Sequence, residues 1–466
     1  MDFDVIVIGG GSAGTAAASA AAAAGARVAM VNDGELGGLC ILRGCMPTKT
    51  ILHSAHALHE MRHAGPLGIE VVSARPRFAE IMRRKDEKVA RFKRAKVESI
   101  EASGYEVIDA RARFVDRETL EVGGRPLRAR GYVIATGSVP AVPAVPGIRE
   151  VPFMTSDDVM RLTEPPASLV IQGAGPVGLE LGQFFARMGA PTTLVNRSPV
   201  CSKVDADCSA EMTRVLNDEE NFTLHAPGRI LSVGPSGSRL RFEIESGGRS
   251  FKHDAAAFLV ATGRNAAVDG LGLERAGVEM EQGRIRRDAA MRTSNPAVFV
   301  AGDATGDHQI LHLANQEGRV AGHNVAGGRP GKMMDYRLKM SVIFTDPPMA
   351  CVGMNEKEAA AAGRTTLTAL KRIPSQGRAI TMEARHGIFK VVADAQSCEI
   401  LGAQILGPRA DDLIHVISAI MHYRGKVQDL AAMPWYHPTL AESLIEIARK
   451  FAAQVPGCEA PPAPPA

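Results

Sequence analysis

Two cysteines followed closely by a lysine form the segment of this chain whose residue types are best suited to chemistry. Cys40 and Cys45 lie in GGLCILRGCMPTK, residues 37–49, with Gly44 between them. Such a pair could be a structural disulfide, part of a metal site, or a redox pair that exchanges electrons. Seven cysteines scattered over a long chain do not form a secreted disulfide framework, and the sequence has no second cluster with zinc-ligand spacing. We therefore favour the redox pair over a metal site and over two buried thiols.

The spacing of the two cysteines constrains the backbone between them. On an ideal helix, positions five apart have Cα atoms about 8 to 9 Å apart, beyond the roughly 7 Å limit for a disulfide. We expect a helix near Cys45 with a distorted start, where Gly44 supplies the backbone freedom. The helix N-terminus would lower the pKa of the Cys45 thiol, and Lys49 would share its helix face.

A second candidate for chemistry lies in HPTLAE, residues 437–442. The imidazole of His437 suits proton exchange with a dithiol, and the Glu442 carboxylate on its other nitrogen would fix the tautomer and raise its basicity. Pro438 is typical of a first helical turn, so we expect a helix to begin here. Considered alone, a histidine at a helix start is more often a cap or a surface group.

Two glycine-rich turns of the form GxGxxG indicate the elements that must position these residues. Each follows an apolar strand and opens a helix, which is the context of a dinucleotide-binding βαβ unit. The glycines are Gly9, Gly11 and Gly14 in the first unit and Gly173, Gly175 and Gly178 in the second. They let the backbone approach a pyrophosphate, whose charge the helix N-terminus stabilises. We predict two dinucleotide sites rather than two turns without a ligand.

Three further segments divide the chain. YVIATGSVP (132–140) and FLVATGRNA (258–266) predict short strands that end in Ala-Thr-Gly and mark crossovers between domains. TSNPAVFVAGDAT (293–305) predicts a buried strand followed by Gly302-Asp303. From about residue 337, strand-like runs followed by helices indicate a different domain.

Composition and charge exclude several classes of function. A chain of 466 residues exceeds one hydrophobic core and indicates two to four domains. With 45% apolar residues, a net charge of +3 and no basic stripe interleaved with aromatics, no nucleic-acid partner is expected. The acidic start MDFD and the short apolar run after it are unlike a signal peptide or a membrane span, so we expect a cytoplasmic protein without a membrane partner. The cysteines without a motif, expected to be buried as small hydrophobic residues, are Cys201, Cys208, Cys351, Cys398 and Cys458.

The order of these motifs resembles that of one family. Over roughly residues 1–455, the two GxGxxG units, CxxxxC with PxK after it, the two Ala-Thr-Gly strands, Gly-Asp and HPxxxE resemble the pyridine nucleotide-disulfide oxidoreductases. This flavoprotein group includes dihydrolipoamide dehydrogenase, glutathione reductase and mercuric reductase. The resemblance implies an α/β fold of the glutathione-reductase type, with two Rossmann-like domains and an α+β dimerisation domain. The implied division is residues 1–145 and 265–335 for FAD, 146–264 for NAD(P), 336–455 for the homodimer interface, and 456–466 as a disordered Pro/Ala-rich tail.

The resemblance also implies roles for the residues around the cysteine pair. Cys40 would exchange with the substrate, and Cys45 would contact the flavin. Lys49 would lie beside the reactive flavin nitrogen, paired with Glu180 of the segment GLELG. A solvated lysine and an ordinary helix glutamate are the alternatives.

The late motif carries a similar implication. His437 and Glu442 would act in the partner subunit's active site, so that dimerisation would be needed for activity. The histidine also argues against a mercuric reductase in the narrow sense, since those enzymes usually lack it and carry a C-terminal cysteine pair, whereas this tail has only Cys458.

Cofactor-binding residues are implied in both units. For FAD they are Gly9, Gly11, Gly14, Asn32, Asp33, Gly38, Lys49, Thr136, Gly137, Gly302 and Asp303, and for the nicotinamide nucleotide they are Gly173, Gly175, Gly178, Asn196, Arg197 and Gly263. The acid usually found at the ribose is replaced by Asn32 with Asp33 next to it, and by Asn196-Arg197 in the second unit. The loss of the acid and the presence of Arg197 favour NADP, whereas Gly178 as third glycine favours NAD. NAD is the preferred prediction, and NADP is the alternative.

The resulting functional prediction is a dihydrolipoamide dehydrogenase-like enzyme that oxidises the dithiol of lipoamide or of a lipoyl-carrying protein and reduces NAD. The alternative is an NADPH-dependent reductase of a low-molecular-weight disulfide or another oxidant. A redox sensor or scaffold is a third hypothesis, which the catalytic residues oppose. Leu39, Leu42 and Arg43 depart from the family pattern and predict a divergent member; we expect Arg43 to face solvent rather than an acidic carrier.

Overall fold

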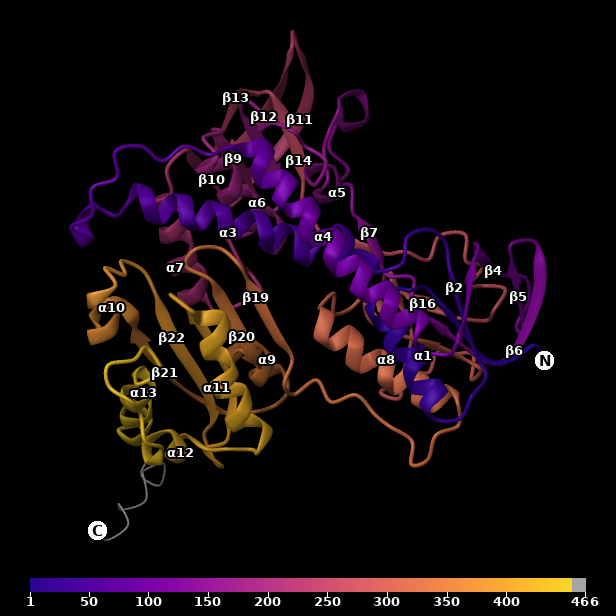
Figure 1. Ribbon diagram of the computed structural model, residues 1–466. Coiled ribbons are helices and arrows are strands. Elements are labelled where there is room, and N and C mark those ends of the chain that lie inside the picture. Colours follow the sequence, from indigo (N-terminus) through magenta and orange to yellow (C-terminus); the bar gives the residue numbers. More distant parts are fainter. Residues whose placement is uncertain (455–466) are drawn as a thin grey trace.

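The computed structural model describes residues 1–454 of a mixed α/β chain built around a seven-stranded, a four-stranded and a five-stranded sheet (Figure 1). The Pro/Ala-rich tail that was predicted to be disordered, with Cys458, lies outside the described residues. No helix in the described part of the chain is long and apolar enough to cross a membrane.

The seven-stranded sheet forms around the apolar strand that precedes the first glycine-rich turn. Its order is β3-β2-β1-β6-β5-β4, with β18 also paired to β6. The strands are β1 (Phe3–Ile8), β2 (Val28–Asn32), β3 (Glu106–Asp109), β4 (Ala112–Phe114), β5 (Thr119–Val122), β6 (Arg125–Ile134) and β18 (Val298–Val300). Helix α1 (Ser12–Ala23) connects β1 to the parallel β2, so the predicted βαβ unit is present.

Helix α1 packs against α8 (Leu311–Val325) at very short range. A Cβ atom added to Gly318 or Gly322 of α8 would lie 2.3 or 2.1 Å from a backbone carbonyl oxygen of α1. Only glycine fits at both places, and the alanine-rich sequence of α1 provides the matching small side chains.

The cysteine segment lies on two helices, α2 (Gly38–Leu42) and α3 (Cys45–Arg62). Helix α3 runs beside α4 (Phe78–Glu101), and Figure 1 shows this pair reaching from the first sheet towards the second. The apolar face of α3, with Ile51 and Leu52, joins the same core as helix α6 (Pro176–Arg187) of the second unit. The redox segment is therefore held between the two dinucleotide-binding units.

The four-stranded sheet is parallel, in the order β10-β9-β8-β14. Its elements are β8 (Leu169–Gln172), α6 (Pro176–Arg187), β9 (Thr192–Val195), α7 (Ala206–Asn217), β10 (Phe222–His225) and β14 (Ala257–Val260). A three-stranded antiparallel sheet lies beside it, formed by β11 (Gly228–Ser236), β12 (Arg239–Ser246) and β13 (Arg249–Ala255). The two predicted crossover segments meet, because β7 (Ser138–Pro140) pairs with β15 (Arg264–Ala266).

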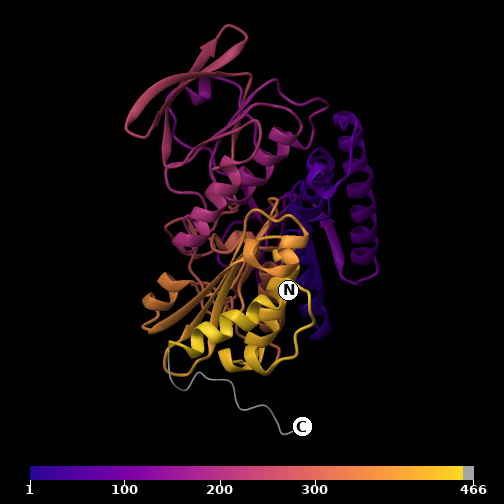
Figure 2. The ribbon, with the colours of Figure 1, turned by 90° about the vertical axis from the view of Figure 1, so that its left-hand side faces the viewer.

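The five-stranded sheet is antiparallel, in the order β19-β20-β23-β22-β21, and it forms a separate layer with its helices below the four-stranded sheet (Figure 2). Its elements are β19 (Met340–Ile343), β20 (Met349–Gly353), α9 (Glu356–Ala361), β21 (Thr366–Arg372), α10 (Gly377–Thr381), β22 (Ile388–Asp394), β23 (Ile400–Leu406), α11 (Ala410–His422), α12 (Val427–Ala432) and α13 (Ser443–Ala452). The remaining short elements are α5 (Ser156–Val159), β16 (Met280–Glu281), β17 (Arg284–Ile285) and the 3-10 turns Gly65–Leu67, Ile148–Glu150, Gly302–Thr305 and Ile373–Ser375.

One predicted helix start is wrong. Helix α13 begins at Ser443, so residues 437–442 form a loop and Pro438 lies outside the helix.

Candidate active site

The two cysteines lie on opposite sides of a break between helices. Cys40 is in α2, Cys45 is the first residue of α3, and both are half-buried free thiols. Their side chains are hydrogen-bonded to each other. The turn between them is tight, because a Cβ at Gly44 would lie 3.0 Å from the carbonyl oxygen of Leu39, a contact that glycine avoids. The expected distortion at the start of the helix takes the form of this break, which brings the thiols together.

The hydrogen bond makes the two thiols chemically unequal. The pKa of Cys45 is lowered to about 7, first because the Cys40 thiol donates to it and further because the Lys49 ammonium lies nearby. The pKa of Cys40 is raised, because its S–H is held by Cys45 and because burial penalises its thiolate. Above about pH 7 the reduced pair therefore holds a thiolate at Cys45 and a thiol at Cys40.

The cysteine segment lies directly against the first glycine-rich turn. Gly38 has a φ of +72°, and a Cβ there would lie 2.6 Å from the Cα atom of Gly11. The start of α2 can approach the start of α1 this closely because residue 38 is a glycine. A dinucleotide bound at the N-terminus of α1 would consequently lie next to the thiol pair.

Lys49 and Glu180 form an ion pair across the two dinucleotide-binding units. The Lys49 Nζ to Glu180 Oε2 distance is 2.8 Å, with side-chain exposures of 30% and 3%. The Glu180 Oε1 atom accepts a hydrogen bond of 2.9 Å from the backbone N–H of Phe344, and the ammonium lies 4.6 Å from the centre of the Phe344 ring. Sequence reasoning missed Phe344, which directly follows β19 of the five-stranded sheet and has no local motif.

Replacing Lys49 by methionine is expected to lower the free energy of unfolding by about 2 to 4 kcal/mol, because the Glu180 carboxylate would stay buried without its cation. Glu180→Gln should cost less, since the Lys49 ammonium is partly solvated. The apparent melting temperature of the FAD-loaded protein measures both losses. Lys88→Met, an exposed lysine of α4, is the control and should change stability by less than about 0.5 kcal/mol. Equal melting temperatures for the Lys49 and Lys88 variants would contradict the expectation.

The first glycine-rich turn has the shape that a dinucleotide requires. Gly9 has a φ of +112°, and its added Cβ would lie 2.3 Å from the carbonyl oxygen of Ala135. The space above Gly11, the N-cap of α1, is open, with only Gly38 near its added Cβ. The buried hydroxyl of Thr136 has no hydrogen-bond partner within the described chain. The free helix end and the unsatisfied hydroxyl fit a bound FAD.

Gly302 and Asp303 are held by residues that sequence reasoning did not single out. The Ser138 hydroxyl donates to Asp303 Oδ2 at 2.6 Å, and Arg264 Nε donates to the same hydroxyl at 2.8 Å. The fully buried Glu317 accepts from the Gly302 N–H at 2.7 Å. Burial raises the pKa of Asp303. Ser138 and Arg264 come from the paired β7 and β15, a contact that no local pattern indicates.

Asn32 and Asn196 hold the two glycine-rich turns in the same way. Asn32 Oδ1 accepts from the Gly10 N–H at 2.8 Å, and Asn196 Oδ1 accepts from the Ala174 N–H at 3.2 Å. Each side-chain amide also donates to the turn that follows its strand, at 2.7 Å. Both side-chain amides are therefore hydrogen-bonded to backbone groups, of the glycine-rich turn on one side and of the turn after their own strand on the other. Asp33 is exposed, next to Asn32.

The second unit repeats the geometry of the first. Gly173 has a φ of +116°, and a Cβ at Gly178 would lie 1.9 Å from the carbonyl oxygen of Gly173. The space around an added Cβ at Gly175, the N-cap of α6, is open. Arg197 is exposed at the end of β9 with no ion-pair partner in residues 1–454. The residues present fit a nicotinamide nucleotide, with a cation near the place of its ribose. The loops of Gly137 (φ +78°) and Gly263 (φ +124°) are also open.

His437 and Glu442 lie together in the loop between α12 and α13, in the domain of the five-stranded sheet. His437 Nδ1 is 2.9 Å from Glu442 Oε2, and the His437 side chain is 79% exposed. Gln376, which sequence reasoning missed, donates from Nε2 to Glu442 Oε1 at 2.7 Å and caps α10 through its Oε1. No contact within the described chain joins His437 to Cys40 or Cys45. A single subunit therefore does not bring the base to the thiol pair.

The residues that depart from the family pattern are partly explained. The exposed Arg43 lies 3.5 Å from Asp157 of α5, so it bridges the cysteine segment to the second unit while remaining in solvent contact. Leu39 and Leu42 are half-buried.

The other cysteines mostly follow the expectation of burial. Cys201 and Cys208 are buried free thiols whose pKa values burial raises, and Cys351 is a half-buried free thiol. Cys398 is also buried, as expected, and it is disulfide-bonded. Within residues 1–454, no group of three or more His, Cys, Asp or Glu side chains is arranged to hold a metal ion.

Comparison with known proteins gives the same picture along nearly the whole chain. Residues 3–318 match the family model for pyridine nucleotide-disulphide oxidoreductase, and residues 340–448 match the model for the dimerisation domain of those proteins. A mercuric reductase of Streptomyces lividans is 33% identical over 466 residues, which cover 97% of this chain and 97% of the relative. A dihydrolipoyl dehydrogenase of Thermus scotoductus is 32% identical over 462 residues, covering 97% and 98%.

A solved structure has the same fold. The HOCl-induced flavoprotein disulfide reductase RclA from Escherichia coli superposes with a TM-score of 0.83 at 25% identity, over 96% of this chain and 99% of that chain. The named relatives differ in substrate at nearly equal identity, so identity alone does not separate their activities.

Proposed function

Because the chain belongs to the pyridine nucleotide-disulphide oxidoreductase family, we propose that it is a dihydrolipoamide dehydrogenase-like enzyme that oxidises a dithiol and reduces NAD. The family resemblance, the α/β fold with a dimerisation domain, and FAD with a nicotinamide nucleotide as cofactors are confirmed. FAD, held at the first glycine-rich turn beside Thr136, would supply a two-electron acceptor between the thiol pair and the nicotinamide. The proposal assigns residues 1–145 and 265–335 to FAD, 146–264 to NAD and 336–455 to the subunit interface, in a cytoplasmic homodimer.

The observation that carries the proposal is the unequal thiol pair at Cys40 and Cys45. In the oxidised enzyme, a substrate thiolate attacks Cys40, the Cys40–Cys45 bond breaks, and Cys45 leaves as a thiolate. The lowered pKa of Cys45 makes it the better leaving group. The second substrate thiol then displaces Cys40, so the substrate gains a disulfide as the protein loses one.

His437 supplies the proton transfer in this proposal. Its ring takes a proton from the substrate dithiol, and Glu442, held by Gln376, keeps Nδ1 engaged so that Nε2 is the free nitrogen. Its exposure on the dimerisation domain supports a role in the site of a second subunit.

The test is an anaerobic reaction of the oxidised, FAD-loaded dimer with dihydrolipoamide and NAD. NADH formation, together with alkylation of Cys40 and Cys45 only after the dithiol is added, is the expected result. No NADH and no newly alkylated cysteine would overturn the proposal.

A second candidate is an NADPH-dependent reductase of a small disulfide, which runs the same exchange in reverse. Asn196 and Arg197, which follow β9, favour it, because a 2′-phosphate would meet a guanidinium that has no ion-pair partner in the described part of the chain, and an amide where the family usually has an acid. Faster turnover with NADPH and a disulfide than with NAD and dihydrolipoamide would establish this candidate.

Arg197→Gln is expected to weaken NADP⁺ binding about tenfold, or about 1.4 kcal/mol, and to leave NAD⁺ binding unchanged, because only NADP⁺ carries the 2′-phosphate. Equilibrium titration of the oxidised enzyme with each nucleotide measures this difference. Arg229→Gln on β11 is the matched control in the same unit. An equal loss for both nucleotides would show that Arg197 does not contact the ribose phosphate.

A further inference from the structure

A cavity of about 850 Å³ lies on α1, away from every residue assigned above to catalysis or cofactor binding. Its walls come from α1, α4, α8 and the loop after α8, at residues 327–332. None of the cysteines, glycine-rich turns or ribose-side residues described above lines it. It is therefore a separate feature of the first unit.

The charged side chains that line this cavity are all basic. They are Lys96, Arg319, Arg329 and Lys332, with the imidazole of His323 beside them, and no aspartate or glutamate of residues 1–454 lines the cavity. Neither Lys96, Arg319 nor Lys332 has an ion-pair partner in the part of the chain that the structure describes. Elsewhere in the chain many arginines and lysines are paired, as Arg187 is with Glu219.

Among these cations, Lys96 gives the strongest indication of an external anion. It is half-buried, and its Nζ donates 2.7 Å to the neutral hydroxyl of Thr15. Burial lowers its pKa, and no carboxylate in residues 1–454 forms an ion pair with it. A half-buried cation with a neutral partner is costly unless an anion from outside approaches it.

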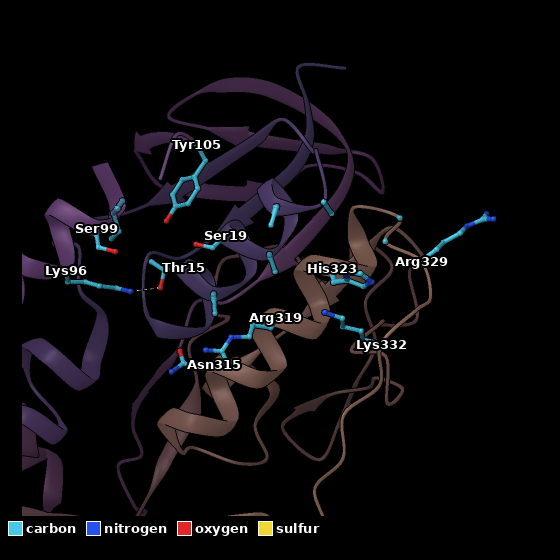
Figure 3. A pocket seen from close by; sticks show the side chains of 17 residues that line it. Thr15, Ser19, Lys96, Ser99, Tyr105, Asn315, Arg319, His323, Arg329 and Lys332 are labelled. Atoms are coloured by element: carbon cyan, nitrogen blue, oxygen red, sulfur yellow. Dashed lines mark hydrogen bonds between the residues drawn. The ribbon is translucent and has the colours of Figure 1, made fainter. Parts of the chain in front are cut away.

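The basic groups gather at two ends of the cavity. Figure 3 shows Lys96 and Thr15 with Asn315 and Arg319 at one end, and His323 with Lys332 at the other, while Arg329 points away. Arg319 and His323 are one turn apart on the same face of α8, about 6 Å along the helix axis. Two separated groups of donors match an anion with two charged ends.

Small side chains of α1 also line the cavity. They include Ala16, Ala20, Ala23 and Ser19, and Ile100 of α4 adds apolar surface. The volume falls in the range of small-molecule sites rather than of an extended nucleic-acid groove.

We propose that this cavity binds a small anion with two or more phosphate groups, one held by Lys96 and Arg319 and another by Lys332, which lies beside His323. The Nε2 atom of His323 is 2.9 Å from the carbonyl oxygen of Pro330, so it is not counted as a phosphate donor. Guanidinium and ammonium donors without competing carboxylates are the groups that recognise phosphate. The ligand is either an inorganic chain of phosphates or an organic bisphosphate whose carbon body covers the small side chains of α1.

Calorimetric titration of the FAD-loaded protein tests this proposal. The probes are inorganic tripolyphosphate and fructose 1,6-bisphosphate, neither of which carries the adenosine group of the cofactors. We expect at least one probe to bind with a Kd below about 1 mM at physiological salt. Binding of tripolyphosphate alone indicates the inorganic source, and tighter binding of fructose 1,6-bisphosphate indicates the organic one.

Variants locate the binding. Lys96→Gln and Arg319→Gln should each weaken it about tenfold, whereas Arg319→Lys should retain most of it. Lys88→Gln, which removes the same charge two turns earlier on α4, is the control and should bind like the parent protein. Arg319 is exposed, so its variant tests the site even if Lys96→Gln disturbs folding. No binding of either probe, or equal weakening in the Lys88 and Arg319 variants, would overturn the proposal.

Discussion

Replacing Cys45 by serine should lower the kcat of dithiol oxidation by about a thousandfold or more, with FAD still bound. Serine cannot form the disulfide with Cys40, so the protein has no pair to accept electrons from the substrate. The glycine-rich turn of the first unit does not depend on the sulfur atom. The measurement is dihydrolipoamide-dependent NADH formation, with the flavin absorbance as the check on cofactor content.

Cys208→Ser is the control for this prediction, because Cys208 is a buried free thiol in α7 and should not affect turnover. Full activity of the Cys45 variant would refute the redox role of the pair.

The same pair predicts a pH dependence. The Cys45 thiolate is present above its pKa of about 7 and is lost as the pH falls through that value, so its alkylation rate in the reduced enzyme should rise with pH around 7. The Cys40→Ser variant changes the hydrogen-bond donor that contributes most to the lowered pKa of Cys45. The increase in alkylation rate should therefore move to higher pH. An unchanged profile would count against the hydrogen bond between the thiols.

His437→Gln should lower kcat for dihydrolipoamide by about 10² to 10⁴-fold, the usual contribution of a general base. NADH oxidation by a one-electron acceptor such as ferricyanide should be unaffected, because it bypasses the thiol exchange. Gln376→Ala should give a smaller loss, since it frees Glu442 without removing the imidazole. Equal loss of the ferricyanide reaction would point to a structural defect instead.

Mixed dimers test where His437 acts. Inactive His437→Gln and Cys45→Ser chains, unfolded and reassembled together, should recover about a quarter of parental activity, because half of the dimers are mixed and each has one complete site. If His437 acted on its own chain, no site would be complete and activity would stay absent.

Several features of this chain were predictable because they depend on residues close together in sequence. The two βαβ units follow from glycine spacing after apolar strands, and the predicted fold class and family are confirmed. The closeness of His437 and Glu442, five residues apart, is also local. The expected helix start at Pro438 is wrong, because proline at a first turn is a preference that the surrounding loop overrides.

Contacts between segments that are distant in the sequence could not be predicted from local sequence patterns. Lys49 and Glu180 are 131 residues apart, and only the family resemblance suggested their pairing. No pattern indicated that Phe344 would hold Glu180, that Gln376 would hold Glu442, or that Asn32 would accept a hydrogen bond from Gly10 of the glycine-rich turn.

The sequence by itself determined the chemistry available to this protein: a cysteine pair broken by glycine, a histidine with its carboxylate, and two turns open to pyrophosphate. Such features rest on residue type and short-range backbone geometry, which a few neighbouring residues specify. Only the tertiary structure decided which charges meet. The ion pair between Lys49 and Glu180 and the cavity lined by basic side chains between α1, α4 and α8 both depend on helices from remote parts of the chain that pack together.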